Sequence, residues 1–149
     1  MSDTSQPFGN IAQLQFQQSY LSLYSKFTKD HEWIEYDTTT KIGKIGITKF
    51  AQGELGDIVH VDIKEVGQTF TKGDGITAIE SVKTAADVYA PVTGEVISQN
   101  QKVKDDPALV NSDSETDGWL IQVKISDEKD LSDLMDEKQY EKFLEESKH

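Results

Sequence analysis

The sequence predicts a mostly β fold, a small barrel or sandwich of short strands. Between residues 41 and 125, runs rich in β-branched residues alternate with turns that contain glycine, a pattern typical of small β barrels and sandwiches. The chain has 149 residues and no cysteine, which is long enough to bury one core without disulfides. We therefore expect one folded domain built mainly from strands.

Six runs have the length and composition of strands. They are residues 41–47, 57–63, 75–81, 85–91, 94–100 and 118–125. The last run, GWLIQVKI, is the most regular, since a large apolar side chain stands at every second position from Trp119 onward. A period of two predicts a strand with one buried face.

Short helices are predicted between and after these strands. In TKFAQGELGD, Thr48 can cap a helix and Gly56 can end it in the left-handed conformation. In KDDPALVN, Pro107 fits the first turn of a helix. After Ile125, apolar residues recur at helical spacing, which predicts one or two amphipathic helices packed across the barrel.

The first 23 residues are rich in Gln and Ser, and we interpret them as a poorly ordered extension of a folded domain over residues 24–149. Apolar residues at the start of the chain could line one helical face: Phe16, Tyr20, Leu23, Tyr24 and Phe27. No Lys or Arg precedes Lys26. This absence argues against an intact secretory signal or an Arg-rich organelle presequence.

The charge of the chain excludes several classes of partner. The net charge is -12, and all fifteen basic residues are lysines. Such an acidic surface repels nucleic acids and anionic lipids, and no apolar run has the length of a membrane span. We expect no nucleic acid and no membrane as a partner. The charge serves solubility, and it is equally suited to steering the protein toward basic docking sites on larger proteins.

Histidines and tryptophans are assigned structural roles. The three histidines show no metal-ligand spacing, so a metal enzyme is not expected. His31 precedes Glu32, but the sequence places no nucleophile to use such a pair, and we interpret His31 as a surface or packing residue. Trp33 and Trp119 are predicted to be core aromatics.

One lysine stands between two predicted strands, in AIESVKTAADVYAP (residues 78–91). If these strands pair as a hairpin, Val82, Lys83 and Thr84 form its tip and the lysine projects into solvent. The tip lacks the Asn-Gly or Gly-Gly of the commonest two-residue turns. A tip lysine alone predicts only an exposed, solubilising side chain. A functional role is indicated by the sequence on either side of it.

Several separated blocks occur in the order of a known family: DHEW, GITKFAQGELGDIVHVDIKEVG, ESVKTAADVYAPVTGEV and DGWLIQVKIS. Over about residues 24–143 the chain resembles the H proteins of the glycine cleavage system. The resemblance implies a monomer with a lipoyl/biotinyl-type barrel-sandwich hybrid fold, in which Lys83 carries lipoic acid through an amide. Biotin-carrier domains usually place methionine on both sides of the modified lysine, and acyltransferase lipoyl domains usually have Asp-Lys. This chain has Val82 and Thr84 there.

The resemblance also implies a function as a non-catalytic carrier. The lipoyl arm would take the aminomethyl group of glycine from the pyridoxal-phosphate-dependent P-protein and deliver it to the tetrahydrofolate-dependent T-protein. The L-protein, a dihydrolipoyl dehydrogenase, would then reoxidise the arm. A chain without cysteine agrees with this role, because all disulfide exchange occurs on the cofactor.

Four acidic residues take roles from the same resemblance. Glu80 matches the recognition acid for the lipoylating enzyme, a lipoate ligase or lipoyl transferase. Glu32 and Asp87 match positions that hold the loaded arm in a cleft, and Asp30 adds to the negative electrostatic field in that cleft. Each of these acids could instead be an ordinary solvated carboxylate.

Three alternatives stay open. The protein could be a relay that donates lipoate to other lipoyl domains, a small acid-base enzyme that uses Asp30, Glu32 and Asp87, or an interaction module with an unmodified lysine. The compartment depends on the same resemblance. The length of the N-terminal extension favours the mitochondrial matrix or a related organelle, its lack of basic residues argues against that, and the bacterial cytoplasm is the alternative.

Overall fold

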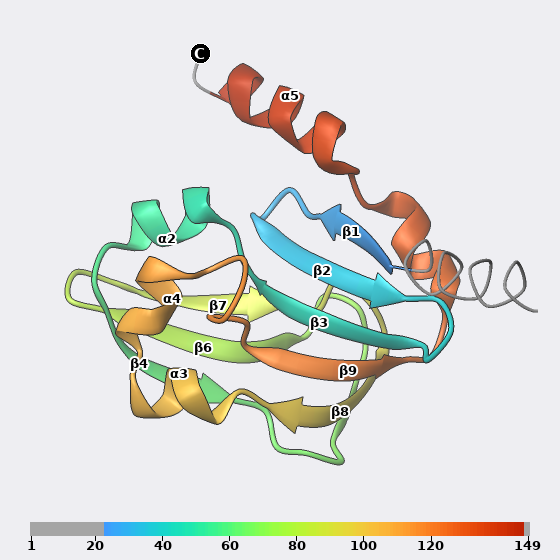
Figure 1. Ribbon diagram of the computed structural model, residues 1–149, viewed down its shortest axis with the longest axis horizontal. Helices are drawn as coiled ribbons and strands as arrows, with labels where there is room; N and C mark the ends of the chain where they lie inside the picture. The colour runs from blue at the N-terminus through green and yellow to red at the C-terminus, as the bar shows by residue number, and fades with distance from the viewer. Residues whose placement is uncertain (1–22, 148–149) are drawn as a thin grey trace, which may run out of the picture.

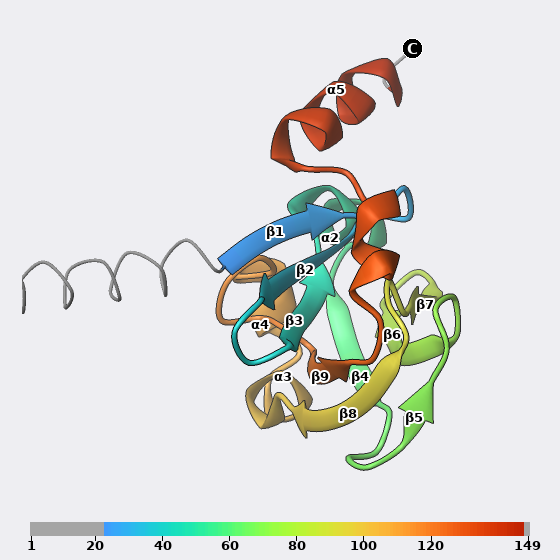
Figure 2. The same ribbon diagram turned by 90° about the vertical axis from the view of Figure 1, so that its right-hand side faces the viewer.

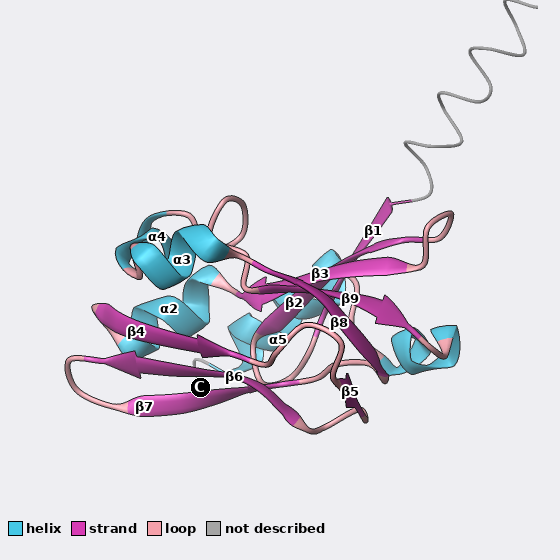
Figure 3. Cartoon of the chain, turned by 90° about the horizontal axis from the view of Figure 1, so that it is seen from below, coloured by secondary structure: helices cyan, strands magenta, loops and turns pink. Residues whose placement is uncertain are grey.

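The computed structural model describes residues 23–147 and arranges their strands in two antiparallel sheets (Figure 1). The larger sheet has the order β1 (Leu23–Phe27), β2 (Glu32–Asp37), β3 (Ile42–Ile47), β9 (Ile121–Ile125), β8 (Gly94–Gln99) and β5 (Thr69–Phe70). The smaller sheet has the order β4 (Ile58–Ile63), β6 (Gly75–Ser81) and β7 (Ala85–Tyr89). Seen from below, the sheets form two layers (Figure 3). The mostly β prediction is therefore confirmed.

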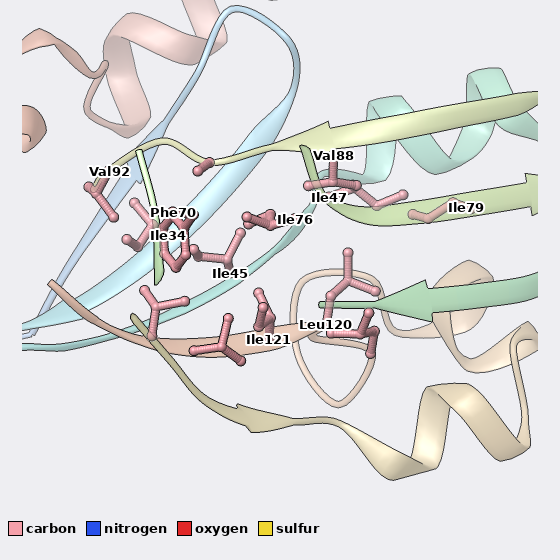
Figure 4. Close-up of a cluster of buried hydrophobic side chains, with 14 of the residues drawn as sticks. Ile34, Ile45, Ile47, Phe70, Ile76, Ile79, Val88, Val92, Leu120 and Ile121 are labelled. Carbon is pink, nitrogen blue, oxygen red and sulfur yellow. The ribbon is translucent and has the colours of Figure 1, made fainter. Parts of the chain in front are cut away.

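The core lies between the two sheets (Figure 4). Ile34, Ile45 and Ile121 of the larger sheet and Ile76 and Ile79 of the smaller sheet are almost completely buried. Each buried side chain of this size contributes roughly 1.5–3 kcal/mol relative to an exposed one. Burial of the apolar faces of both sheets is what holds the layers together.

All six predicted runs contain a strand, and the prediction for β6 is confirmed at both ends. In the run 118–125 the strand begins only at Ile121, and Leu120 just before it is fully buried. Trp33 is buried as predicted, and its indole N–H donates to the carbonyl oxygens of Ile47 and Ser114 at 3.0 Å each. Trp119 is only partly buried.

Strands β1, β2 and β5 were not predicted. In β2, charged residues at both ends and in the middle obscure the alternation, although Trp33, Ile34 and Tyr36 are buried. The prediction of a helical face was wrong for residues 23–27, because β1 pairs with β2 from Leu23 to Phe27. The rest of that predicted face, including Phe16 and Tyr20, lies outside the described residues, and the division at residue 23 stays a prediction.

Three short helices connect the strands: α2 (Lys49–Leu55), α3 (Gln101–Asp105) and α4 (Ala108–Ser112). The N-cap of α2 is confirmed, since Thr48 Oγ1 accepts a hydrogen bond from the Ala51 N–H at 3.2 Å. Gly56 ends α2 with φ 81° and ψ -156°. The positive φ was predicted, but the extended ψ lies outside the left-handed helical region, because the chain turns directly into β4. Pro107 precedes α4 as its N-cap.

The C-terminal segment forms a 3₁₀ turn, η2 (Glu128–Asp133), and helix α5 (Glu137–Ser147). The prediction of packing across the barrel was wrong for α5, which lies beside β1 at the edge of the larger sheet and projects away from the rest of the fold (Figure 2). Its Tyr140 ring stacks on Phe27 with centroids 4.7 Å apart. The aromatic face of α5 packs there because the inner faces of the sheets already bury each other. Within residues 23–147 no helix is long and apolar enough to cross a membrane.

Candidate functional site: a lysine hairpin beside an acidic groove

Strands β6 and β7 form the predicted hairpin, with Glu80 and Ala85 as the last paired residues. Val82, Lys83 and Thr84 make up its tip, and all three are exposed. Among residues 23–147, no acidic side chain forms an ion pair with Lys83. The ε-amine is therefore accessible to another protein.

The side chain of Ser81 shapes the tip. Its Oγ accepts hydrogen bonds from the N–H groups of Lys83 at 3.3 Å and Thr84 at 3.1 Å, and its hydroxyl lies 3.1 Å from the Thr84 carbonyl oxygen, to which it donates. Ser81 thus supplies the bonds that make an Asn-Gly turn unnecessary. Sequence reasoning did not predict these hydrogen bonds of Ser81. The signal was its position directly before a turn, where serine commonly bonds to nearby backbone groups.

The junction between α2 and β4, residues 56–58, braces the tip from one side. The Val82 N–H donates to the Asp57 carbonyl oxygen at 2.9 Å. The Lys83 stem lies against Gly56, where an added Cβ would stand 3.3 Å from Lys83 Cε. The hairpin tip is therefore fixed through its backbone, while the amine at the end of the lysine side chain stays exposed.

An acidic groove of about 660 Å³ lies over the smaller sheet. Its lining includes Asp30, Asp62, Glu80 and Asp87. Glu80 pairs with His60 on β4, and Asp87 pairs with Ala78 on β6, so the groove starts beside the lysine tip and follows the sheet. The structure thus brings together three of the four predicted acids and adds Asp62, which sequence reasoning missed.

The fourth predicted acid, Glu32, lies in an adjoining cavity of about 300 Å³ that shares Asp30 and Tyr89 with the groove. Glu32 is only 3% exposed, and its carboxylate accepts hydrogen bonds from Thr28 Oγ1 at 2.8 Å and from the Tyr89 N–H at 2.6 Å. Burial raises the pKa of Glu32 from 4.5 to about 7, against the opposing effect of these two hydrogen bonds. Glu32 is therefore not a solvated carboxylate, whereas Asp30, Glu80 and Asp87 are exposed.

His31 lies between Asp30 and Glu32 in the sequence, but its side chain does not share their surroundings. Its ring packs against Phe50 with centroids 4.4 Å apart, and Nδ1 is hydrogen-bonded to the Tyr140 hydroxyl at 2.8 Å. Burial lowers the pKa of His31. The interpretation of His31 as a packing residue is confirmed, and the histidine takes no part in the groove.

A family model described as "Glycine cleavage H-protein" matches residues 25–147. The chain belongs to the glycine cleavage H-protein family. The glycine cleavage system H protein of Thermotoga maritima is 48% identical over 118 residues, which cover 79% of this chain and 94% of that protein. The protein of the same name from Halothermothrix orenii is 45% identical over 120 residues, covering 80% and 92%.

A solved structure extends this likeness to the fold. The crystal structure of a glycine cleavage system H protein from Mycobacterium marinum is 34% identical and matches with a TM-score of 0.72, covering 78% of this chain and 92% of that one. The expected lipoyl-domain-like fold is thereby confirmed. These three relatives are bacterial, so they give no support to the expected mitochondrial location.

Proposed function

We propose that this H-protein family member is a non-catalytic carrier of the glycine cleavage system, with lipoic acid attached to Lys83 through an amide. One observation carries the proposal: the amine of Lys83 is exposed on a hairpin tip whose backbone is fixed by Ser81 and Asp57. A lysine on such a tip can enter the active site of a modifying enzyme without unfolding the carrier.

Attachment requires an activated lipoyl donor, such as lipoyl adenylate. The Lys83 amine attacks the acyl carbonyl carbon, the C–N bond forms, the C–O bond to the phosphate breaks, AMP leaves, and the proton of the amine goes to solvent. The lysine loses its positive charge in this step. Glu80 is exposed three residues before Lys83, which is consistent with recognition by the lipoylating enzyme, a lipoate ligase or lipoyl transferase.

When bound, the lipoyl group would supply the carrier and redox chemistry for the aminomethyl group of glycine, with the P-, T- and L-proteins as its partners. The residues of this chain provide the electrostatic surroundings. Asp30 and Asp87 line the groove beside the tip, where their carboxylates attract a protonated amine. Glu32 is costly to ionise because it is buried, and a nearby amine cation would favour its charged form.

Partners and location are proposed on the same basis. A net charge of -12 favours docking to basic surfaces on the P-, T- and L-proteins. The bacterial origin of the compared relatives supports the bacterial cytoplasm over the mitochondrial matrix. The family match over residues 25–147 supports a carrier domain within residues 24–149, and we propose that this domain acts as a monomer.

The intact mass of the protein after incubation with lipoate, ATP and a lipoate ligase tests attachment. We expect the unsubstituted protein to gain one lipoyl group and Lys83→Arg to gain none. An unmodified wild-type protein would contradict the proposal and leave an interaction module. Exchange of bicarbonate into glycine with added P-protein then tests the carrier role, and a lipoylated protein that is inert in this exchange would indicate a lipoyl relay instead.

A further inference from the structure

We infer that Asn111 on α4 is a positioning residue for the acylation of Lys83, because it fixes the α2–β4 junction against which the lysine tip rests. The inference rests on the proposed function and deepens it, since it concerns how Lys83 is presented to the lipoylating enzyme. Asn111 does not touch Lys83 and acts through the junction.

One amide side chain makes three hydrogen bonds here, two to the junction and one to α2. Asn111 Oδ1 accepts a hydrogen bond from the Ile58 N–H at 2.9 Å. Its Nδ2 donates to the Gly56 carbonyl oxygen at 2.8 Å and to Gln52 Oε1 at 3.0 Å. Asn111 therefore joins the last turn of α2, the glycine that ends it and the first residue of β4. Figure 1 shows α4 next to α2 and close to the start of β4.

The backbone of the junction needs such support. Gly56 has φ 81° and ψ -156°, a region that is nearly restricted to glycine, and glycine loses more conformational freedom on folding than any other residue. Asn111 bonds to the Gly56 carbonyl and to the N–H two residues later. Those two bonds fix the peptide groups on both sides of Asp57.

The same junction meets the hairpin tip at two points. The Asp57 carbonyl oxygen accepts the Val82 N–H at 2.9 Å. Gly56 presents a face without a side chain to the Lys83 stem, which lies close enough that a Cβ there would be 3.3 Å from Cε. A displaced junction would therefore lose the Val82 bond and the surface that supports the lysine stem.

An ordered tip affects how the lipoylating enzyme binds this protein. If only a fraction of the molecules holds the docking conformation, the apparent affinity falls by that fraction, whereas the reaction of the docked complex does not change. Loss of the Asn111 bonds should therefore raise KM for this protein as a substrate and leave kcat unchanged. A general loss of folded protein would also raise the apparent KM without changing kcat. It is recognised separately, because it would be visible in the unfolding curve.

The test measures initial rates of lipoylation with a lipoate ligase, by intact mass, over a range of protein concentrations. For Asn111→Ala we expect KM to rise about 3–10-fold with kcat unchanged. Hydrogen exchange gives a second readout without the cofactor: the Val82 amide should exchange faster, by a similar factor. Asn111→Asp, which keeps the acceptor for Ile58 and removes both donors, should change KM and exchange in the same direction.

Asn100→Ala is the matched control. Asn100 Oδ1 accepts the Lys102 N–H at 3.1 Å, and Nδ2 donates to the carbonyl oxygens of Asp117 at 2.9 Å and Trp119 at 2.7 Å. This variant loses as many hydrogen bonds as Asn111→Ala, but none of them reaches the junction or the tip. We expect a comparable loss of stability with unchanged KM and unchanged Val82 exchange.

Each outcome decides between the two claims. Lipoylation of the wild type with equal KM for wild type and both Asn111 variants would overturn the inference and leave the proposed function intact. Equal rises in KM for Asn111→Ala and Asn100→Ala would also overturn it, since the effect would then be one of stability alone. A wild-type protein that is never lipoylated would contradict the proposed function, and the inference would fall with it.

Discussion

Lys83 and Glu32 are two ionisable side chains of the candidate site, and they lie in opposite environments. Lys83 is exposed on a hairpin tip whose backbone is bonded to Asp57 and to the Ser81 hydroxyl. Glu32 is buried, and Thr28 and Tyr89 donate hydrogen bonds to its carboxylate. In one region the backbone is fixed and the side chain is left free, and in the other the charged group itself is fixed. Changes at the tip should therefore affect modification, whereas changes at Glu32 should affect stability and its pH dependence.

The largest effect is expected for Lys83→Arg. Arginine stays protonated in proteins and offers no nucleophilic amine, so lipoylation should be lost completely. The free energy of unfolding should change by less than about 0.5 kcal/mol, because the side chain is exposed. Intact mass and urea denaturation measure the two quantities. A loss of more than about 1 kcal/mol would show that Lys83 contributes to folding and would break the contrast with Glu32.

Glu32→Gln should change the pH dependence of stability. Glu32 has a pKa of about 7 in the folded state against 4.5 for an exposed carboxyl, so the folded state binds the proton more tightly. The stabilisation from this group is full below pH ~4.5 and is lost as pH rises through ~7. Between pH ~5 and ~8 the loss of stabilisation amounts to about 2.5 kcal/mol.

Glutamine cannot ionise, so the variant should not lose this stabilisation. Its free energy of unfolding minus that of the wild type should therefore rise by about that amount from the lower to the higher pH. Urea denaturation of both proteins at the two pH values measures the difference. Parallel stability curves would mean that Glu32 titrates like an exposed glutamate, in conflict with its burial.

Ser81→Ala tests whether the tip backbone is held by the serine hydroxyl. The Lys83 and Thr84 N–H groups lose an acceptor, which should cost about 1 kcal/mol of stability and slow lipoylation several-fold. Ser132→Ala is the control, because Ser132 is exposed and, within residues 23–147, its hydroxyl bonds only to the Lys129 carbonyl. Equal lipoylation rates for both variants would contradict the role of Ser81.

Glu80→Gln should change the free energy of unfolding as little as Lys83→Arg does, by less than about 0.5 kcal/mol, because Glu80 is also exposed. Recognition by the lipoylating enzyme should nevertheless be impaired, with lipoylation slowed a few-fold. Asp62→Asn is a matched control, since it removes the same charge from the lining of the same groove. If both variants slowed lipoylation equally, the cause would be the overall charge of the groove and not Glu80.

Local sequence patterns predicted the part of the fold that carries the lysine. The limits of β6 and the tip at residues 82–84 follow from β-branched runs and their interruption, and both were found as expected. The N-cap at Thr48 follows from a rule that involves only neighbouring residues. Strand β2 was missed because its buried residues are interspersed with charged ones, and its burial depends on the strands on either side.

The sequence by itself determined the strand-rich fold and the exposed lysine, and its resemblance to H proteins predicted which acids belong to the candidate site. Only the tertiary structure decided that Glu32 is buried while Asp87 is exposed, and that Asn111 supports the tip through residues 56–58. The physical reason is the range of the interactions. Turns, caps and periodicity depend on near neighbours, whereas burial and hydrogen bonds between distant segments exist only once the two sheets and α4 have packed.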